Sequence, residues 1–63
     1  QDYAIILTTT AYLKNAPVET MNAADTIQTG VKVQIIDADK NWRKIKLPND
    51  KTGWIEKSNL GLI

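Results

Sequence analysis

The chain has 63 residues, enough for one small domain, with 43% hydrophobic residues and a formal net charge of +1. It contains no cysteine and no histidine, which excludes disulfides and zinc sites built from thiolate or imidazole ligands. No apolar run reaches the length of a membrane span or a signal peptide, and the balanced charge gives no footprint for nucleic acid; we therefore expect no metal, no cofactor, no membrane insertion and no nucleic-acid partner.

Two strands are predicted at the start of the chain. Residues 3–10 are aromatic, aliphatic or β-branched, and such side chains fit a pleated sheet. Residues 11–14 alternate between inward and outward positions and predict a second short strand. Pro17 ends this strand, because proline supplies no amide hydrogen and restricts the residue before it.

A long polar segment follows and leads into a third strand. Residues 18–25 show no sustained strand or helix period, so we predict a loop there, with one helical turn at residues 21–24. Residues 26–28 predict a brief strand. It ends at Gly30, since glycine permits a positive φ in a turn.

The second half of the chain shows the clearest alternation. Strands are predicted at residues 31–35 and 42–47, because apolar side chains alternate with polar ones in residues 31–35 and 44–47, as in half-buried strands. Residues 37–41 are predicted to be a polar connection between these strands. Residues 48–51 predict a hairpin turn, and residues 52–55 the strand that returns from it.

The chain ends with a predicted helical turn at residues 58–60 and a last short strand at residues 62–63. Many short strands with frequent turns and no amphipathic helix indicate an all-β protein. Two full sheets do not fit in this length, so we predict a small barrel of five to six short antiparallel strands. The predicted core consists of Ala4, Ile6, Leu13, Ile27, Val33, Ile35, Ile45, Leu47, Ile55 and Leu60.

The order of these motifs resembles the bacterial SH3-like (SH3b) domain, and the resemblance covers nearly the whole chain. The segments that match the family's pattern, in order, are residues 4–6, 11–17, 30–35, 42–45, 53–55 and 58–60. The resemblance implies that residues 1–63 form a single SH3-like barrel with a helical turn near its C-terminus. Because the chain begins with Gln1 rather than methionine, we expect it to be part of a longer protein.

The closing residues, 53–63, are also similar to the C-terminal SH3 domain of aerotolerance-operon (Bat-type) tetratricopeptide-repeat proteins. This narrower resemblance implies a location in the bacterial cell envelope, periplasmic or anchored to the membrane through other parts of the protein.

Trp42 is the leading candidate for ligand binding. It alternates out of phase with Ile45 and Leu47, so its ring is expected to be exposed, and exposed indoles are common interface anchors. The resemblance places it where the tryptophan of eukaryotic SH3 domains lines a peptide groove. The predicted ligand-binding residues are Trp42, Tyr12, Glu56 and Asn59, with the loop at residues 19–25 as a variable wall.

The predicted groove departs from the eukaryotic pattern. Glu56 stands where that pattern has a proline, Leu60 stands where it has a tyrosine, and residues 13–17 contain no aromatic side chain. We therefore predict that proline-rich recognition in its usual form is absent. Structural alternatives remain open: Trp42 packs on the barrel edge or the long loop. Trp54 is predicted to cover a flank of the barrel while the next residue enters the core.

Metal binding and catalysis find little support in the sequence. Residues 37–41 copy the start of an EF-hand calcium loop, but Trp42 and Pro48 stand where that loop needs glycine and glutamate. Without histidine or cysteine, a nucleophile would depend on Ser58 or a threonine, so we predict that the domain is not an enzyme. Its basic residues between positions 40 and 51 are predicted to discourage edge pairing rather than to form a positive binding face.

The sequence therefore predicts a binding module that holds a peptide or a partner protein and is monomeric as an isolated domain. Two alternatives stay open. In the first, the domain targets a wall hydrolase to cell-wall peptides. In the second, it is a structural module whose flank, including Trp54 and residues 62–63, docks on neighbouring repeats.

Overall fold

Short antiparallel strands make up the computed structural model, which describes residues 2–8, 10–17 and 25–62. The elements in chain order are β1 (Asp2–Ile6), β2 (Thr10–Leu13), β3 (Asp25–Gln28), β4 (Lys32–Asp39), β5 (Trp42–Lys46), β6 (Thr52–Glu56), a 3-10 turn (Lys57–Asn59) and β7 (Leu60–Leu62). The predicted all-β class is confirmed. No helix in this described part of the chain is long and apolar enough to cross a membrane.

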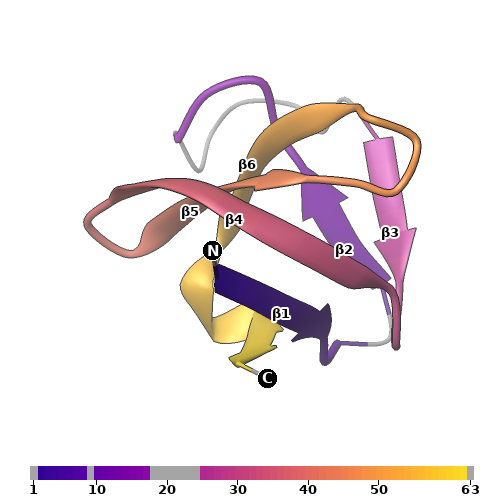
Figure 1. Cartoon of the computed structure of the whole chain (residues 1–63). Coiled ribbons are helices and arrows are strands. Elements are labelled where there is room, and N and C mark those ends of the chain that lie inside the picture. Colours follow the sequence, from indigo (N-terminus) through magenta and orange to yellow (C-terminus); the bar gives the residue numbers. More distant parts are fainter. Residues whose placement is uncertain (1, 9, 18–24, 63) are drawn as a thin grey trace.

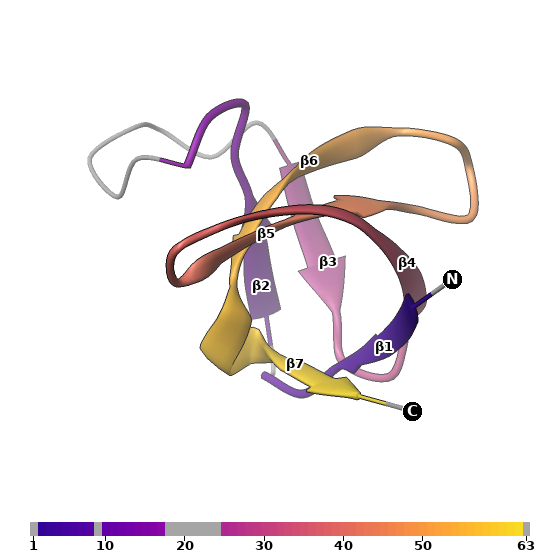
Figure 2. The same ribbon diagram turned by 60° about the vertical axis from the view of Figure 1, so that its left-hand side comes forward.

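The strands curve around one interior in two sheets (Figures 1 and 2). One sheet has the order β6-β5-β4-β1-β7, and β2 and β3 form the other. The backbone joins them where β2 ends: Lys14 N donates to Trp54 O at 2.8 Å, and Trp54 N donates to Lys14 O at 2.7 Å. This bridge holds the small sheet against β6, which gives the predicted small barrel. Strands β1 and β7 pair as well, so the first and last strands lie side by side (Figure 2).

The alternation of the strands produces the core. The buried hydrophobic residues are Ala4, Ile6, Ala11, Leu13, Ile27, Val33, Ile45, Leu47 and Ile55. Two predicted core residues, Ile35 and Leu60, are only partly buried and pack against this cluster. Ala11 is buried although we did not predict it, because alanine has a weak hydrophobic signal and its burial depends on β2 pairing with β3.

Gly53 allows β2 to approach β6 closely. It lies two residues before Ile55 and is buried like it. A Cβ atom at Gly53 would lie 2.8 and 2.9 Å from Cδ1 and Cδ2 of Leu13, which is closer than carbon atoms pack. The Leu13 side chain therefore takes the space that a side chain at position 53 would need, and this contact sets the separation of the two sheets.

Strand β4 is longer than the sequence predicted. It continues to Asp39, which pairs directly with Trp42, so the predicted polar connection at residues 37–41 is wrong. Only Lys40 and Asn41 remain between the two strands, and Lys40 adopts a positive φ of 54°. The hairpin of β4 and β5 consequently extends beyond the barrel, on the left in Figure 1.

A β-bulge in β4 explains why the alternation misled the prediction. Ile35 pairs with Ile45, but the next pair is Asp37 with Lys44, which leaves Ile36 as the extra residue. A bulge of this kind shifts the register and re-aims the side chains that follow it. Ile36 is 44% exposed as a result, and the pairing of Asp37 with Lys44 places opposite charges across the two strands, a favourable arrangement.

The remaining boundaries differ by small amounts. The first strand ends at Ile6 rather than at residue 10, and Thr10 belongs to β2. The helical turn and the last strand each begin one or two residues earlier than predicted. The helical turn predicted at residues 21–24 lies outside the described residues, as does most of the loop at residues 18–25.

Candidate functional site

The outer face of β5 and β6 carries both tryptophans. Trp42 pairs with Glu56, and Lys44 pairs with Trp54. Residues directly opposite one another in antiparallel strands project to the same face, so these four side chains share the face that points away from Ile45. Trp42 is half-buried rather than exposed as predicted, because another side chain covers its ring.

That side chain is Lys14, whose Nζ lies 5.5 Å from the centre of the Trp42 ring. At this distance the ammonium is attracted by the negative face of the indole. Lys14 reaches the ring because its backbone is bonded to Trp54 on the neighbouring strand. The contact therefore joins the end of β2 to β5 across β6.

A pocket of about 140 Å³ opens beside this contact. It is lined by Tyr12, Lys14, Trp42, Glu56 and Asn59. The structure thus brings together all four residues that the sequence predicted for the ligand groove. Lys14 was not predicted, and the only sequence signal for it is its place at the end of the second strand, two residues after Tyr12.

The carboxylate of Glu56 is the least satisfied charged group of this pocket. The residue is half-buried, yet its side chain makes no ion pair or hydrogen bond with any residue that the structure describes. Glu56 occupies the N-cap position of the 3-10 turn, but its side chain makes no capping hydrogen bond. The carboxylate is therefore available to a ligand.

Asn59 is positioned by the backbone on two sides. Leu7 N donates to Asn59 O at 2.9 Å, and Lys57 N donates to Asn41 O at 2.7 Å. These bonds tie the 3-10 turn to the end of β1 and to the tip of the β4–β5 hairpin. The turn therefore holds the Asn59 amide at the edge of the pocket, where it offers both a hydrogen-bond donor and an acceptor.

Trp54 does not line the pocket. It is half-buried on the outer face, between Lys44 on β5 and Lys14 at the end of β2. Ile55, next to it, is fully buried. This arrangement agrees with the prediction that Trp54 covers a flank of the barrel while its neighbour enters the core.

The basic residues do not gather on one face. Lys44 and Lys46 project outward, whereas Arg43 lies in phase with the core residues at the end of the barrel. Its Nη1 donates to the carbonyl oxygens of Lys40 and Trp42, each at 2.8 Å. Arg43 therefore holds the tip of the β4–β5 hairpin and does not contribute to a positive binding surface.

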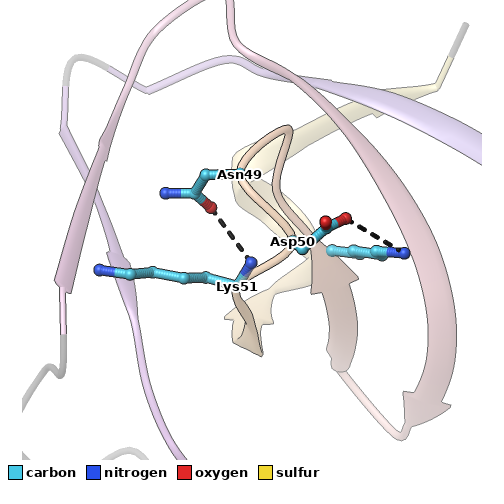
Figure 3. A network of polar contacts seen from close by, with 4 residues as sticks. Asn49, Asp50 and Lys51 are labelled. Atoms are coloured by element: carbon cyan, nitrogen blue, oxygen red, sulfur yellow. Dashed lines mark hydrogen bonds and ion pairs between the residues drawn. The ribbon is translucent and has the colours of Figure 1, made fainter.

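A second polar region surrounds the turn between β5 and β6 (Figure 3). Lys51 N donates to Asn49 Oδ1 at 3.1 Å, and Lys46 Nζ lies 3.3 Å from Asp50 Oδ1. Leu47 N also donates to Lys51 O at 2.8 Å, which confirms the predicted hairpin turn. Asp50 has a positive φ of 70°, a conformation that aspartate tolerates better than most residues.

Next to this turn lies a wider depression of about 380 Å³, for which the sequence gave no prediction. It includes Tyr3 and Lys32 as well as Lys46 and Asp50. Lys32 Nζ lies 4.7 Å from the centre of the Tyr3 ring. This region therefore has the same kinds of groups as the Trp42 pocket, but its carboxylate already has a lysine partner.

Metal ligands are not clustered in the described part of the chain. There, no group of three or more histidine, cysteine, aspartate or glutamate residues could hold an ion. Residues 37–41, which resemble the start of a calcium loop, form the end of β4 and the tip of the hairpin: residues 37–39 pair with β5, and residues 40–41 form the turn.

Comparison with known proteins identifies the family. A model of the bacterial SH3 domain matches residues 9–61, a span that includes every residue of the Trp42 pocket. A search of curated proteins finds no match. Since the family model covers most of the sequence and the strands form the small barrel that it implies, the chain belongs to the bacterial SH3 domain family.

Proposed function

We propose that this domain is a non-catalytic module that binds a peptide segment of a partner protein in the Trp42 pocket. Bacterial SH3 domains are generally binding modules of this kind. The observation that carries the proposal is that one pocket at the junction of the two sheets brings together two aromatic residues, the Asn59 amide and the Glu56 carboxylate, which has no partner among the described residues.

The composition of the pocket supports a peptide ligand. Trp42 and Tyr12 offer apolar ring surfaces, and aromatic residues of this kind are enriched at the energetic centres of interfaces. Asn59 offers an amide that matches the donor and acceptor of a peptide group. A volume of about 140 Å³ holds one side chain, so the remainder of a peptide would lie across the adjoining surface.

The residue types of the pocket argue against catalysis. The chain has no histidine or cysteine. Among the residues that line the pocket with Glu56, the Tyr12 phenol is the one hydroxyl group, and no thiol is present. Nucleophilic catalysis needs a nucleophile and a base within hydrogen-bond reach of each other. Binding is therefore the function that these groups serve best.

We also propose a location in the bacterial cell envelope. Domains of this family commonly occur in extracellular or cell-envelope proteins. The narrower resemblance to Bat-type tetratricopeptide-repeat proteins depends on residues 53–63 alone and stays a prediction.

The proposal is tested by selecting peptides from a random library on the immobilised domain and measuring their affinity. We expect Trp42→Ala to lower the affinity for the selected peptides at least tenfold, because truncation of a central aromatic anchor costs about 2 kcal/mol or more of binding free energy. Tyr3→Ala is the matched control, since it removes a partly exposed aromatic ring outside the pocket. Equal affinity for both variants would contradict the proposal, as would a library that yields no binder.

Cell-wall peptides are the alternative ligand, because family members occur in envelope proteins. Incubation with purified sacculi distinguishes this case: retention that Trp42→Ala abolishes would assign the pocket to the cell wall. The docking alternative predicts instead that the Trp42 face is protected from hydrogen exchange only in a longer chain. Protection that is the same in the isolated domain would exclude it.

A further inference from the structure

We infer that the Trp42 pocket selects a cationic side chain of a peptide, a lysine-like ammonium, and that Lys14 occupies the place of this cation in the unliganded domain. The inference rests on the proposed function and adds the chemical class of the group that the pocket recognises. It depends on three observations: the position of the Lys14 ammonium, the state of the Glu56 carboxylate, and the contrast with the Tyr3 region.

The first observation is that the pocket already holds an ammonium group. Lys14 Nζ lies 5.5 Å from the centre of the Trp42 ring, and both residues line the pocket. The indole face is the most favourable aromatic surface for a cation. The domain's own lysine therefore shows which kind of group this surface accepts.

The second observation is that the pocket contains a carboxylate which Lys14 does not neutralise. No ion pair joins Lys14 to Glu56 within 4.0 Å, and the Glu56 side chain has no partner among the described residues. A half-buried carboxylate loses part of its hydration and gains from a cation beside it. A peptide ammonium that enters the pocket would contact Glu56 and the Trp42 ring together.

The two ammonium groups cannot share so small a pocket at low cost, because like charges a few ångströms apart repel strongly where water is partly excluded. Lys14 has a long flexible side chain whose ammonium can move off the Trp42 ring while its backbone stays bonded to Trp54. The incoming cation therefore displaces the Lys14 ammonium. Because Lys14 competes for the Trp42 ring, it lowers the affinity for the ligand.

The third observation is the contrast with Tyr3. Lys32 Nζ lies over the Tyr3 ring at 4.7 Å, but the nearby carboxylate of Asp50 is paired with Lys46 and is largely exposed. A cation there would find no unneutralised, half-buried carboxylate. The Tyr3 region is therefore an internal control for the inference.

An acidic peptide is the competing reading, with Lys14 as its partner. It would place a second carboxylate close to Glu56, so the charge of the pocket disfavours it. The two readings predict opposite signs for the removal of Lys14: an acidic ligand loses a partner, whereas a cationic ligand loses a competitor.

The experiment uses three acetylated and amidated tripeptides that differ only in the central residue: lysine, norleucine or glutamate. NMR titration of the domain follows the indole N–H signals of Trp42 and Trp54, the second serving as an internal reference outside the pocket. We expect the lysine peptide to shift the Trp42 signal in a saturable manner, and the norleucine and glutamate peptides to bind at least about threefold more weakly.

Two variants then give the decisive signs. Lys14→Met keeps most of the side-chain stem and should raise the affinity for the lysine peptide about two- to fivefold. Glu56→Gln keeps the shape of the side chain and should lower the affinity for the lysine peptide at least about fivefold. Lys32→Met is the matched control for Lys14→Met, because it removes the other lysine that lies over an aromatic ring, and it should leave the affinity unchanged.

The outcomes separate the inference from the proposed function. If the glutamate or norleucine peptide binds best, or if Lys14→Met weakens the lysine peptide, the pocket binds peptides but the inference is overturned. If all three peptides bind equally, the pocket does not recognise charge and the inference is also overturned. If no peptide shifts Trp42 in any folded variant, both the inference and the proposed function fail.

Discussion

The Trp42 pocket and the Tyr3 region are built from the same groups and differ in how those groups are held. Each has a lysine ammonium over an aromatic ring, at 5.5 Å for Lys14 and Trp42 and at 4.7 Å for Lys32 and Tyr3. The closer contact lies in the wider depression, the more distant one in the pocket of about 140 Å³. A cation over a ring does not by itself make a binding site.

The position of each region in the fold explains the difference. The Tyr3 region lies on β1, β4 and β5, neighbouring strands of one hydrogen-bonded sheet. The Trp42 pocket spans two sheets, because Tyr12 lies on β2 while Trp42 and Glu56 lie on β5 and β6. A sheet surface is shallow, whereas a junction between sheets provides walls. The walls keep Glu56 half-buried, while Asp50 at an exposed turn has 83% of its side chain accessible.

The largest effect is expected at Gly53, which allows the two sheets to approach each other closely. Gly53→Ala places a Cβ within 2.9 Å of the Leu13 Cδ atoms, and such overpacking costs about 1–3 kcal/mol of unfolding free energy. Urea denaturation measures this loss. We expect the NMR signals around Tyr12 and Trp42 to shift more than those around Tyr3, because only the pocket depends on the approach of β2 to β6.

A double-mutant cycle supplies the control. In a Leu13→Val background the competing side chain is smaller, so the additional cost of Gly53→Ala should fall by at least about 0.5 kcal/mol. An equal cost in both backgrounds would show that crowding against Leu13 is not the cause.

A smaller effect is expected at the two hairpin turns, each of which has one non-glycine residue with a positive φ. Lys40→Gly should stabilise the domain by about 0.5 kcal/mol, since the strain of a lysine in this conformation exceeds the added chain entropy of glycine in the unfolded state. Asp50→Gly should give no gain, because aspartate tolerates the conformation and the change removes the contact with Lys46. Thermal unfolding measures the stability of both variants. If the Asp50→Gly variant is as stable as the Lys40→Gly variant, the predicted difference between the two turns is refuted.

The smallest effect is expected for the ion pair of Lys46 and Asp50. Exposed pairs contribute little, so Lys46→Met should change the unfolding free energy by less than about 0.5 kcal/mol, and added salt should reduce the difference further. The same variant sharpens the comparison of the two regions. The lysine tripeptide should still leave Tyr3 unperturbed, because Asp50 remains hydrated; a loss above about 1 kcal/mol, or new binding at Tyr3, would contradict this account.

Sequence alternation predicted most of the core, and the family resemblance proposed four residues that the fold places around one pocket. The features that the sequence missed depend mainly on pairing between strands. Strand β4 continues past Ile36 because a bulge restores pairing with β5, and pairing between strands is invisible in a single strand's pattern. Trp42 was placed correctly on the outer face, yet its partial burial by Lys14 depends on a bridge between residues 40 positions apart. Lys14 itself was missed for the same reason.

The sequence by itself determined the all-β class, the inward positions of residues such as Val33, Ile45 and Ile55, and the turn before β6, because side-chain period and turn chemistry are local properties. Only the tertiary structure decided where β4 bends, how β2 meets β6, and that the Glu56 carboxylate in the pocket has no partner among the described residues. These features depend on contacts between segments distant in the chain, and their geometry arises only when the sheets close around the core.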